Sequence, residues 1–132
     1  MSAFLKAAIA GTFGFMLLDA LWLGVVMKSF YRDHLAPIAR MSNGALAPNW
    51  GGALVVYVLL GTGIAVFAQP RDEHAMSAAA AGALLGLVVY GVYDFTNYAT
   101  LRQWPLLLTF VDLAWGAAAS AVCAAAVRVV AR

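Results

Sequence analysis

The sequence predicts an all-α integral membrane protein whose helices form a four-helix bundle. Composition is the first reason: 64% of the 132 residues are hydrophobic, 11% are charged, and the mean hydropathy is +0.87. A soluble domain is only about 45–50% apolar. The second reason is four apolar runs of the length that crosses a bilayer, about 20 residues. These runs cover residues 7–27, 50–68, 76–98 and 105–127, and we expect residues 1–132 to form one transmembrane domain in the lipid bilayer.

The first apolar run is followed by a long connection, residues 28–49, that carries a second signal. Its segment SFYRDHLAPIAR spaces aromatic and aliphatic residues at helical intervals among charged ones. This pattern is typical of a short helix that lies in the membrane interface. The triplet Ser42-Asn43-Gly44 then predicts a turn before the second run.

The remaining connections are short. The second covers residues 69–75, and the third covers residues 99–104 and ends at Pro105, which suits the first turn of a helix. Because short connections place neighbouring helices antiparallel, the sequence predicts up-down-up-down order with the interfacial helix between the first and second helices.

Three aspartates interrupt these hydrophobic runs: Asp19, Asp94 and Asp112. A carboxylate near a helix centre costs about 2.5–3.5 kcal/mol on membrane insertion scales, so intramembrane acids indicate a functional site. In the predicted order they lie about 12, 6 and 10 Å, respectively, from one membrane face at 1.5 Å per residue. We therefore expect one layer of carboxyl groups.

Tyrosine, asparagine and tryptophan side chains surround this layer. Tyr90, Asp94 and Asn97 share a face of the third helix, and a D-x-x-W spacing occurs on both the first and the fourth helix. This spacing predicts that each indole lies beside the carboxyl group of its own helix. The candidate ligand-binding residues are Asp19, Trp22, Tyr57, Tyr90, Tyr93, Asp94, Asn97, Asp112 and Trp115.

No lysine or arginine lies inside a run to neutralise the aspartates, and Arg128 stands only at the far end of the last one. Protons, a bound metal, a cationic ligand or water must therefore compensate the charge, or neutral aspartic acids tie the helices together by hydrogen bonds. Asp19, Asp94 and Asp112 are the candidates for catalysis and for divalent metal ligation. His34 and His74 lie in loops on opposite faces, which argues against a histidine-ligated metal. The sequence does not identify a cofactor, and its identity stays open.

Charge gives little information about partners. The net charge of +2 is spread over loops and tails, so nucleic acid is not an expected partner. Four basic residues fall on each side of the predicted membrane: Lys6, Arg71, Arg128 and Arg132 against Lys28, Arg32, Arg40 and Arg102. The amino terminus tips this balance toward cytoplasmic termini. A G-x-x-x-G pair, Gly82 and Gly86, and a small-residue pair, Gly116 and Ser120, indicate close helix packing within the chain or in a homo-oligomer.

The strings DALWLG, YGVYDFTNYATLRQWP and FVDLAWG resemble an uncharacterised family of small four-helix bacterial membrane proteins, the DUF2177 type, a domain of unknown function. The resemblance covers essentially the whole chain and implies a multi-pass protein of the bacterial inner membrane. It marks as signature positions Asp19, Trp22, Tyr93, Asp94, Thr96, Asn97, Trp104, Asp112 and Trp115. It implies no activity.

Three functions are consistent with these patterns. The first is an intramembrane polar pocket that binds a small or amphiphilic ligand such as a lipid, or protons or ions. The second is a lipid-modifying enzyme that uses the carboxyl groups as acid and base or as metal ligands. The third is a structural or assembly subunit, which an aspartate exposed to lipid would indicate.

Overall fold

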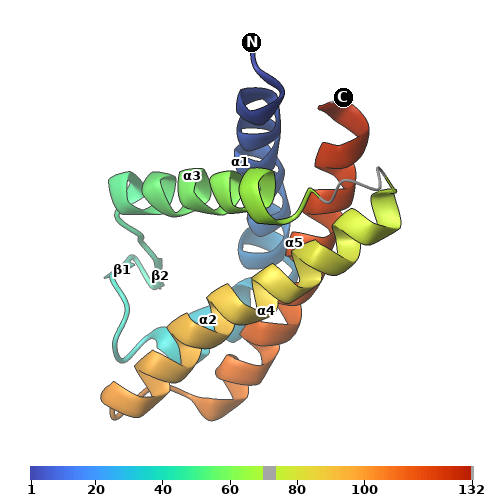
Figure 1. Ribbon diagram of the computed structural model, residues 1–132. Helices are drawn as coiled ribbons and strands as arrows, with labels where there is room; N and C mark the ends of the chain where they lie inside the picture. Colours follow the sequence, from blue (N-terminus) through green and yellow to red (C-terminus); the bar gives the residue numbers. More distant parts are fainter. Residues whose placement is uncertain (70–73, 132) are drawn as a thin grey trace.

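The computed structural model describes residues 1–69 and 74–131 and confirms the all-α class (Figure 1). In these ranges, four segments are long and apolar enough to cross a membrane. They are α1 with its π-helical continuation η1, and α3, α4 and α5. Their bounds are Ala3–Leu21 for α1, Trp22–Val26 for η1, Trp50–Phe67 for α3, Ala75–Thr100 for α4 and Leu106–Val130 for α5.

The long first connection contains the expected short helix. This helix is α2 (Lys28–Leu35), and it is followed by a hairpin of β1 (Met41–Ser42) and β2 (Ala45–Leu46). Asn43 and Gly44 form the turn with φ angles of 51° and 74°. Such positive angles suit an Asn-Gly pair in a tight hairpin turn. The predicted turn is therefore present, and the short paired strands around it are an addition to the prediction.

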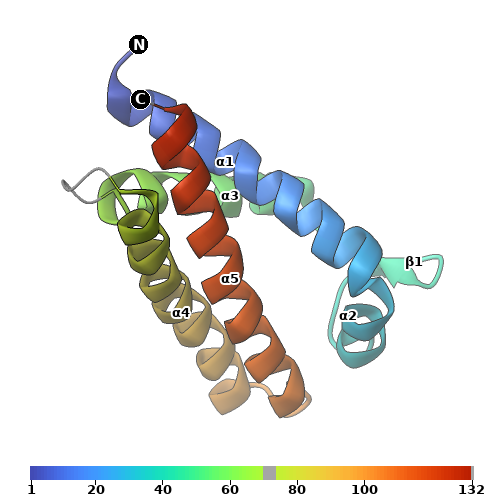
Figure 2. The same cartoon turned by 90° about the vertical axis from the view of Figure 1, so that its right-hand side faces the viewer.

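Helices α4 and α5 pack antiparallel along their length (Figure 2). A side chain at Gly82 would collide with the carbonyl of Ser120, and one at Gly86 would collide with the carbonyl of Gly116. The two small-residue pairs thus face each other and let the helix backbones approach closely. Their role inside this chain is packing of α4 on α5.

Helix α3 lies across α1 instead of beside it in both views (Figures 1 and 2). The crossing is close because Gly11 and Gly61 meet there, and a Cβ at Gly11 would lie 2.9 Å from the Gly61 Cα. Helix α3 packs mainly on α1 and touches α4 and α5 only lightly. The structure therefore does not show the predicted up-down-up-down order, because one helix of the four runs transversely.

Both chain ends lie at one end of the molecule, whereas α2, the end of α4 and the start of α5 lie toward the other (Figure 1). The predicted connection 69–75 falls largely outside the described residues, as do Arg71 and Arg132 of the charge count. Two buried clusters hold the fold together. One is built around Phe15, Ile64 and Cys123 between α1, α3 and α5, and the other joins Tyr31 to Trp104 and Leu108.

Candidate functional site

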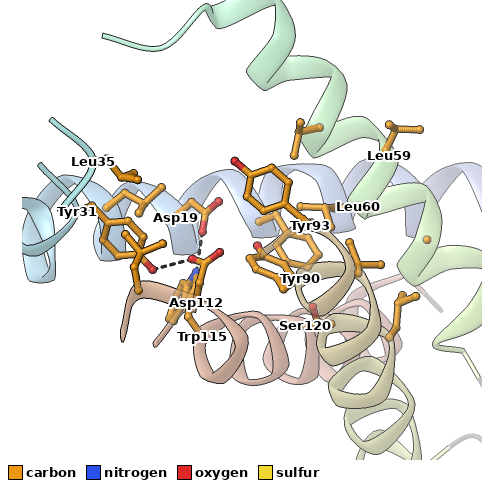
Figure 3. A pocket seen from close by; sticks show the side chains of 18 of the residues that line it. Asp19, Tyr31, Leu35, Leu59, Leu60, Tyr90, Tyr93, Asp112, Trp115 and Ser120 are labelled. Atoms are coloured by element: carbon orange, nitrogen blue, oxygen red, sulfur yellow. Dashed lines mark hydrogen bonds between the residues drawn. The ribbon is translucent and has the colours of Figure 1, made fainter. Parts of the chain in front are cut away.

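A pocket of about 580 Å³ lies where α1, α2, α3, α4 and α5 come together. Figure 3 shows Asp19, Tyr31, Asp112 and Trp115 gathered on one side of it. Leucines of α3 stand on the opposite side, and most of the remaining lining is aliphatic or aromatic. The pocket therefore combines apolar walls with a compact polar floor, which is formed by the carboxyl groups of Asp19 and Asp112.

Asp19 contributes the first carboxyl group of the floor. It lies on the last turns of α1 and is 8% exposed. Its Oδ1 accepts a hydrogen bond of 2.8 Å from the indole Nε1 of Trp115, which belongs to α5. The phenol of Tyr57 on α3 also interacts with this carboxyl group. Three helices thus converge on Asp19.

Asp112 contributes the second carboxyl group, from the second turn of α5. Its Oδ1 accepts a hydrogen bond of 2.7 Å from the hydroxyl of Tyr31, and that hydroxyl accepts a bond of 3.1 Å from Nε1 of Trp22. Tyr31 is 5% exposed. Burial, with the charge of Asp112 as the next cause, raises the pKa of Tyr31 above its usual value near 10. The phenol therefore keeps its proton and acts as a hydrogen-bond donor to the carboxyl group.

Neither indole of the two D-x-x-W motifs donates a hydrogen bond to the aspartate of its own motif. Trp115 donates to Asp19 and not to Asp112, and Trp22 donates to Tyr31 and not to Asp19. The indole rings of Trp22 and Trp115 stack with centroids 4.4 Å apart and planes 1° apart. The expected pairing within each helix is wrong, because the Trp115 indole reaches across to α1 and the Trp22 indole turns to Tyr31 of α2.

Asp94 is the most deeply buried of the three aspartates, with no exposed surface. Neither of its carboxyl oxygens has a hydrogen-bond partner among the described residues. Its carboxyl group interacts with that of Asp112, as the antiparallel register of α4 and α5 allows. Asp94 does not line the pocket. It therefore lies behind the polar floor, next to one of the two carboxyl groups that form it.

The tyrosines and Asn97 divide into two groups. Tyr90 and Tyr93 line the pocket from α4, and Tyr93 is 57% exposed. Tyr57 and Asn97 are half-buried and lie outside the lining, although Asn97 interacts with the phenol of Tyr93 and Tyr57 reaches Asp19. Of the nine candidate residues, the pocket is lined by Asp19, Tyr90, Tyr93, Asp112 and Trp115.

Tyr31 lines the pocket and donates to Asp112, but the candidate set did not contain it. The aromatic spacing correctly predicts that Tyr31 belongs to the short helix, but it does not predict that α2 turns this side chain inward against Trp104 and Leu108. The only sequence signal was a phenol nine residues after Trp22, with no periodicity that joins the two. The apolar lining of the pocket was also not predicted, and it includes Phe15, Leu23, Leu35, Leu46, Leu60, Leu85, Trp104 and Leu108.

The carboxyl groups do not form an evident metal centre. Within the described ranges, no three His, Cys, Asp or Glu side chains are grouped so that they could hold a metal ion. Each pocket carboxyl group instead accepts a hydrogen bond from an aromatic donor. The arrangement offers two acceptors that are already oriented and that lie at the base of an apolar pocket.

Comparison with known proteins identifies one family. The family model described as "Predicted membrane protein (DUF2177)" matches residues 4–129. No curated protein and no solved structure matches the chain. The matched range runs from the second residue of α1 to the last but one residue of α5, and it includes both carboxyl groups of the pocket floor.

Proposed function

The chain belongs to the DUF2177 family of predicted membrane proteins, and on that premise we propose that it binds an amphiphilic molecule inside the membrane, in the pocket described above. One observation carries the proposal: the pocket has a polar floor of Asp19 and Asp112 and apolar walls. Pockets for small molecules have this form, with few oriented polar groups in an apolar lining. A volume of about 580 Å³ accommodates a head group and part of a hydrocarbon chain.

The route into the pocket supports an occupant that comes from the lipid. Helix α3 touches α4 only lightly, and lining residues of both helices are exposed on the facing surface. Val56 and Leu59 of α3 are 52% and 65% exposed, and Val89 of α4 is 40% exposed. In a membrane, such an apolar rim faces lipid tails. A molecule with a hydrocarbon chain enters there without exposing that chain to water.

Two features weigh against an assembly role for the aspartates. Asp94 has no exposed surface and Asp112 is 9% exposed. Neither presents an uncovered carboxyl group to lipid, which was the feature expected of a subunit that awaits a partner. The acid–base alternative needs both pocket carboxyl groups near one bound molecule, and it therefore builds on the same binding site.

Tryptophan fluorescence tests the proposal. The Trp50→Phe variant removes the indole that is 75% exposed and keeps those of the pocket region. In nanodiscs of zwitterionic lipid, we expect a single-chain alcohol or amine with a brominated tail to quench this fluorescence saturably. Bulk lipid contact alone gives quenching that rises without saturation, and that result would refute the proposal. Recovery of a chemically altered amphiphile would instead favour the acid–base alternative.

A pair of glycine variants supplies the control. Gly63 lines the pocket, where an added Cβ meets only Leu85 Cδ2 at 3.5 Å, whereas a Cβ at Gly91 meets nothing within 4 Å and Gly91 lies outside the lining. Gly63→Phe should fill part of the pocket and weaken saturable quenching by about tenfold, comparable to the loss of one good contact. Gly91→Phe should leave the quenching unchanged.

A further inference from the structure

The pocket is lined by acidic residues but by no basic ones. Asp19 and Asp112 line it from α1 and α5, and no lysine, arginine or histidine is among its lining residues. Each carboxyl group accepts one hydrogen bond from a neutral donor, Trp115 or Tyr31. These bonds orient the carboxyl groups but bring no positive charge. Buried charges in proteins are normally paired. The lining supplies no positive charge to pair with Asp19 and Asp112, so an occupant of the pocket must supply it.

We propose that the occupant is a cationic amphiphile, a lipid-like molecule with a protonated amine head group that lies at Asp19 and Asp112. This inference rests on the proposed function and specifies its ligand class. The hydrocarbon chain of such a molecule lies along the apolar lining of α3 and α4, which includes Leu59, Leu60 and Val89.

The aromatic lining favours the same class of head group. Tyr90 and Trp115 line the pocket beside the carboxyl groups, and aromatic faces attract ammonium ions. An anionic head group would meet like charge without any cation to pair with, which suppresses binding of the wrong partner. A neutral hydroxyl can donate a hydrogen bond to either carboxyl group but leaves the charge uncompensated. The amine alone combines donation with opposite charge.

Head-group selectivity of the unmodified pocket gives the primary test. Three amphiphiles with the same brominated tail and an amine, alcohol or sulfate head are titrated into the Trp50→Phe protein in zwitterionic nanodiscs. We expect the amine to saturate the quenching at a concentration at least about tenfold lower than the alcohol, a difference equivalent to one favourable charge contact. The sulfate should be the weakest. Equal affinity for amine and alcohol, or preference for the sulfate, would overturn the charge inference and leave the binding function in place.

Substitutions of Asp19 and Asp112 test whether these two carboxyl groups cause the preference for the amine head group. Asp19→Asn and Asp112→Asn keep the shape of each side chain and should weaken amine binding by roughly 30-fold, the lower end for truncating a buried charge pair. Alcohol binding should change much less. Asp33→Asn is the matched control because it removes the same charge on the exposed face of α2, where Asp33 pairs with Arg32 at 2.8 Å. Equal weakening by Asp33→Asn would show that the amine responds to overall charge, which contradicts the inference.

Failure of the inference and failure of the function are distinguishable. If none of the three amphiphiles gives saturable quenching that Gly63→Phe weakens, the pocket is not an amphiphile site and both proposals fall. If the alcohol or the sulfate binds saturably and the amine shows no advantage, only the cationic head group is refuted. Should an Asn variant not fold, the selectivity among the three head groups in the parent protein still decides.

Discussion

Removal of one oxygen atom should measurably loosen the contact between α2, η1 and α5. The Tyr31 hydroxyl accepts from Nε1 of Trp22 and donates to Oδ1 of Asp112, so Tyr31→Phe deletes two hydrogen bonds and keeps the ring. A bond to a charged group contributes about 1.5–3 kcal/mol. A neutral interhelical bond in a membrane protein averages about 0.6 kcal/mol. We therefore expect the free energy of unfolding to fall by about 2–4 kcal/mol.

The assay is reversible unfolding of the detergent-solubilised protein by a denaturing detergent, followed by tryptophan fluorescence. Tyr98→Phe is the matched control because Tyr98 is 47% exposed on α4, and a surface substitution usually changes stability by less than about 0.5 kcal/mol. The double variant Trp22→Phe/Tyr31→Phe removes both partners of the indole bond. Its cost should be less than the sum of the single costs by about 0.5 kcal/mol or more, as expected for residues in contact.

The same hydroxyl sets a pH dependence. The pKa of Tyr31 is raised in the folded protein above its usual value near 10, so the associated stability is fully present below about pH 10. At higher pH the unfolded chain releases this proton while the folded protein keeps it, and stability falls as pH rises. Tyr31→Phe should make the decline above pH 10 shallower than in the parent or in Tyr98→Phe. A Tyr31→Phe variant that matches Tyr98→Phe in both stability and pH slope would refute the hydrogen-bond argument.

Three further substitutions test the packing and the pocket. Gly86→Ala should destabilise the α4–α5 pair by about 1–3 kcal/mol because its methyl group meets the carbonyl of the facing helix. Gly91→Ala is the control and should stabilise α4 by up to about 1 kcal/mol, because its methyl group meets open space. Equal effects of the two substitutions in thermal unfolding would contradict the close approach of the helices. Asp94→Ala removes a buried carboxyl group without a hydrogen-bond partner among the described residues, so denaturant unfolding should show a stability unchanged or higher by about 1–2 kcal/mol, and a large loss would mean that the group has an essential partner. Val89→Cys modified with a bulky lipid-soluble maleimide should slow the onset of quenching by a brominated amphiphile in stopped-flow measurements, because Val89 is 40% exposed at the rim of the pocket. Val122→Cys, 57% exposed on α5 away from the pocket, is the control and should not slow it.

Much of the fold follows from patterns that are local in the sequence. Apolar run lengths predict the four long helices to within a few residues, since the length of a membrane span is a physical requirement. The alternation of charged and apolar residues predicts α2, and the Asn43-Gly44 pair predicts the turn. The steep crossing of α3 over α1 could not be predicted. It depends on Gly11 meeting Gly61, and nothing local in the sequence says which glycines meet.

In the candidate site, too, the positions could be predicted from local patterns but the contacts between helices could not. The costs of burying Asp19 and Asp112 made both positions conspicuous, and both line the pocket. Their partners were assigned wrongly because the helical spacing of D-x-x-W describes one helix at a time. The bonds from Trp115 to Asp19 and from Tyr31 to Asp112 cross between elements 96 and 81 residues apart in sequence. Such partners depend on how the helices rotate against each other, which sequence periodicity leaves undetermined.

The stacked indoles have a mechanical consequence. Trp22 and Trp115 stack between α1 and α5, and each also donates a hydrogen bond to a side chain of another element. Sliding or rotation of α1 against α5 would break the stack and the hydrogen bond from Trp115 to Asp19 together, so these two helices form a rigid side of the pocket. Within the described residues, helix α3 packs mainly on α1 and only lightly on α4 and α5. If the pocket binds the proposed ligands, we therefore expect molecules of different width to be accommodated by displacement of α3 and not by movement between α1 and α5.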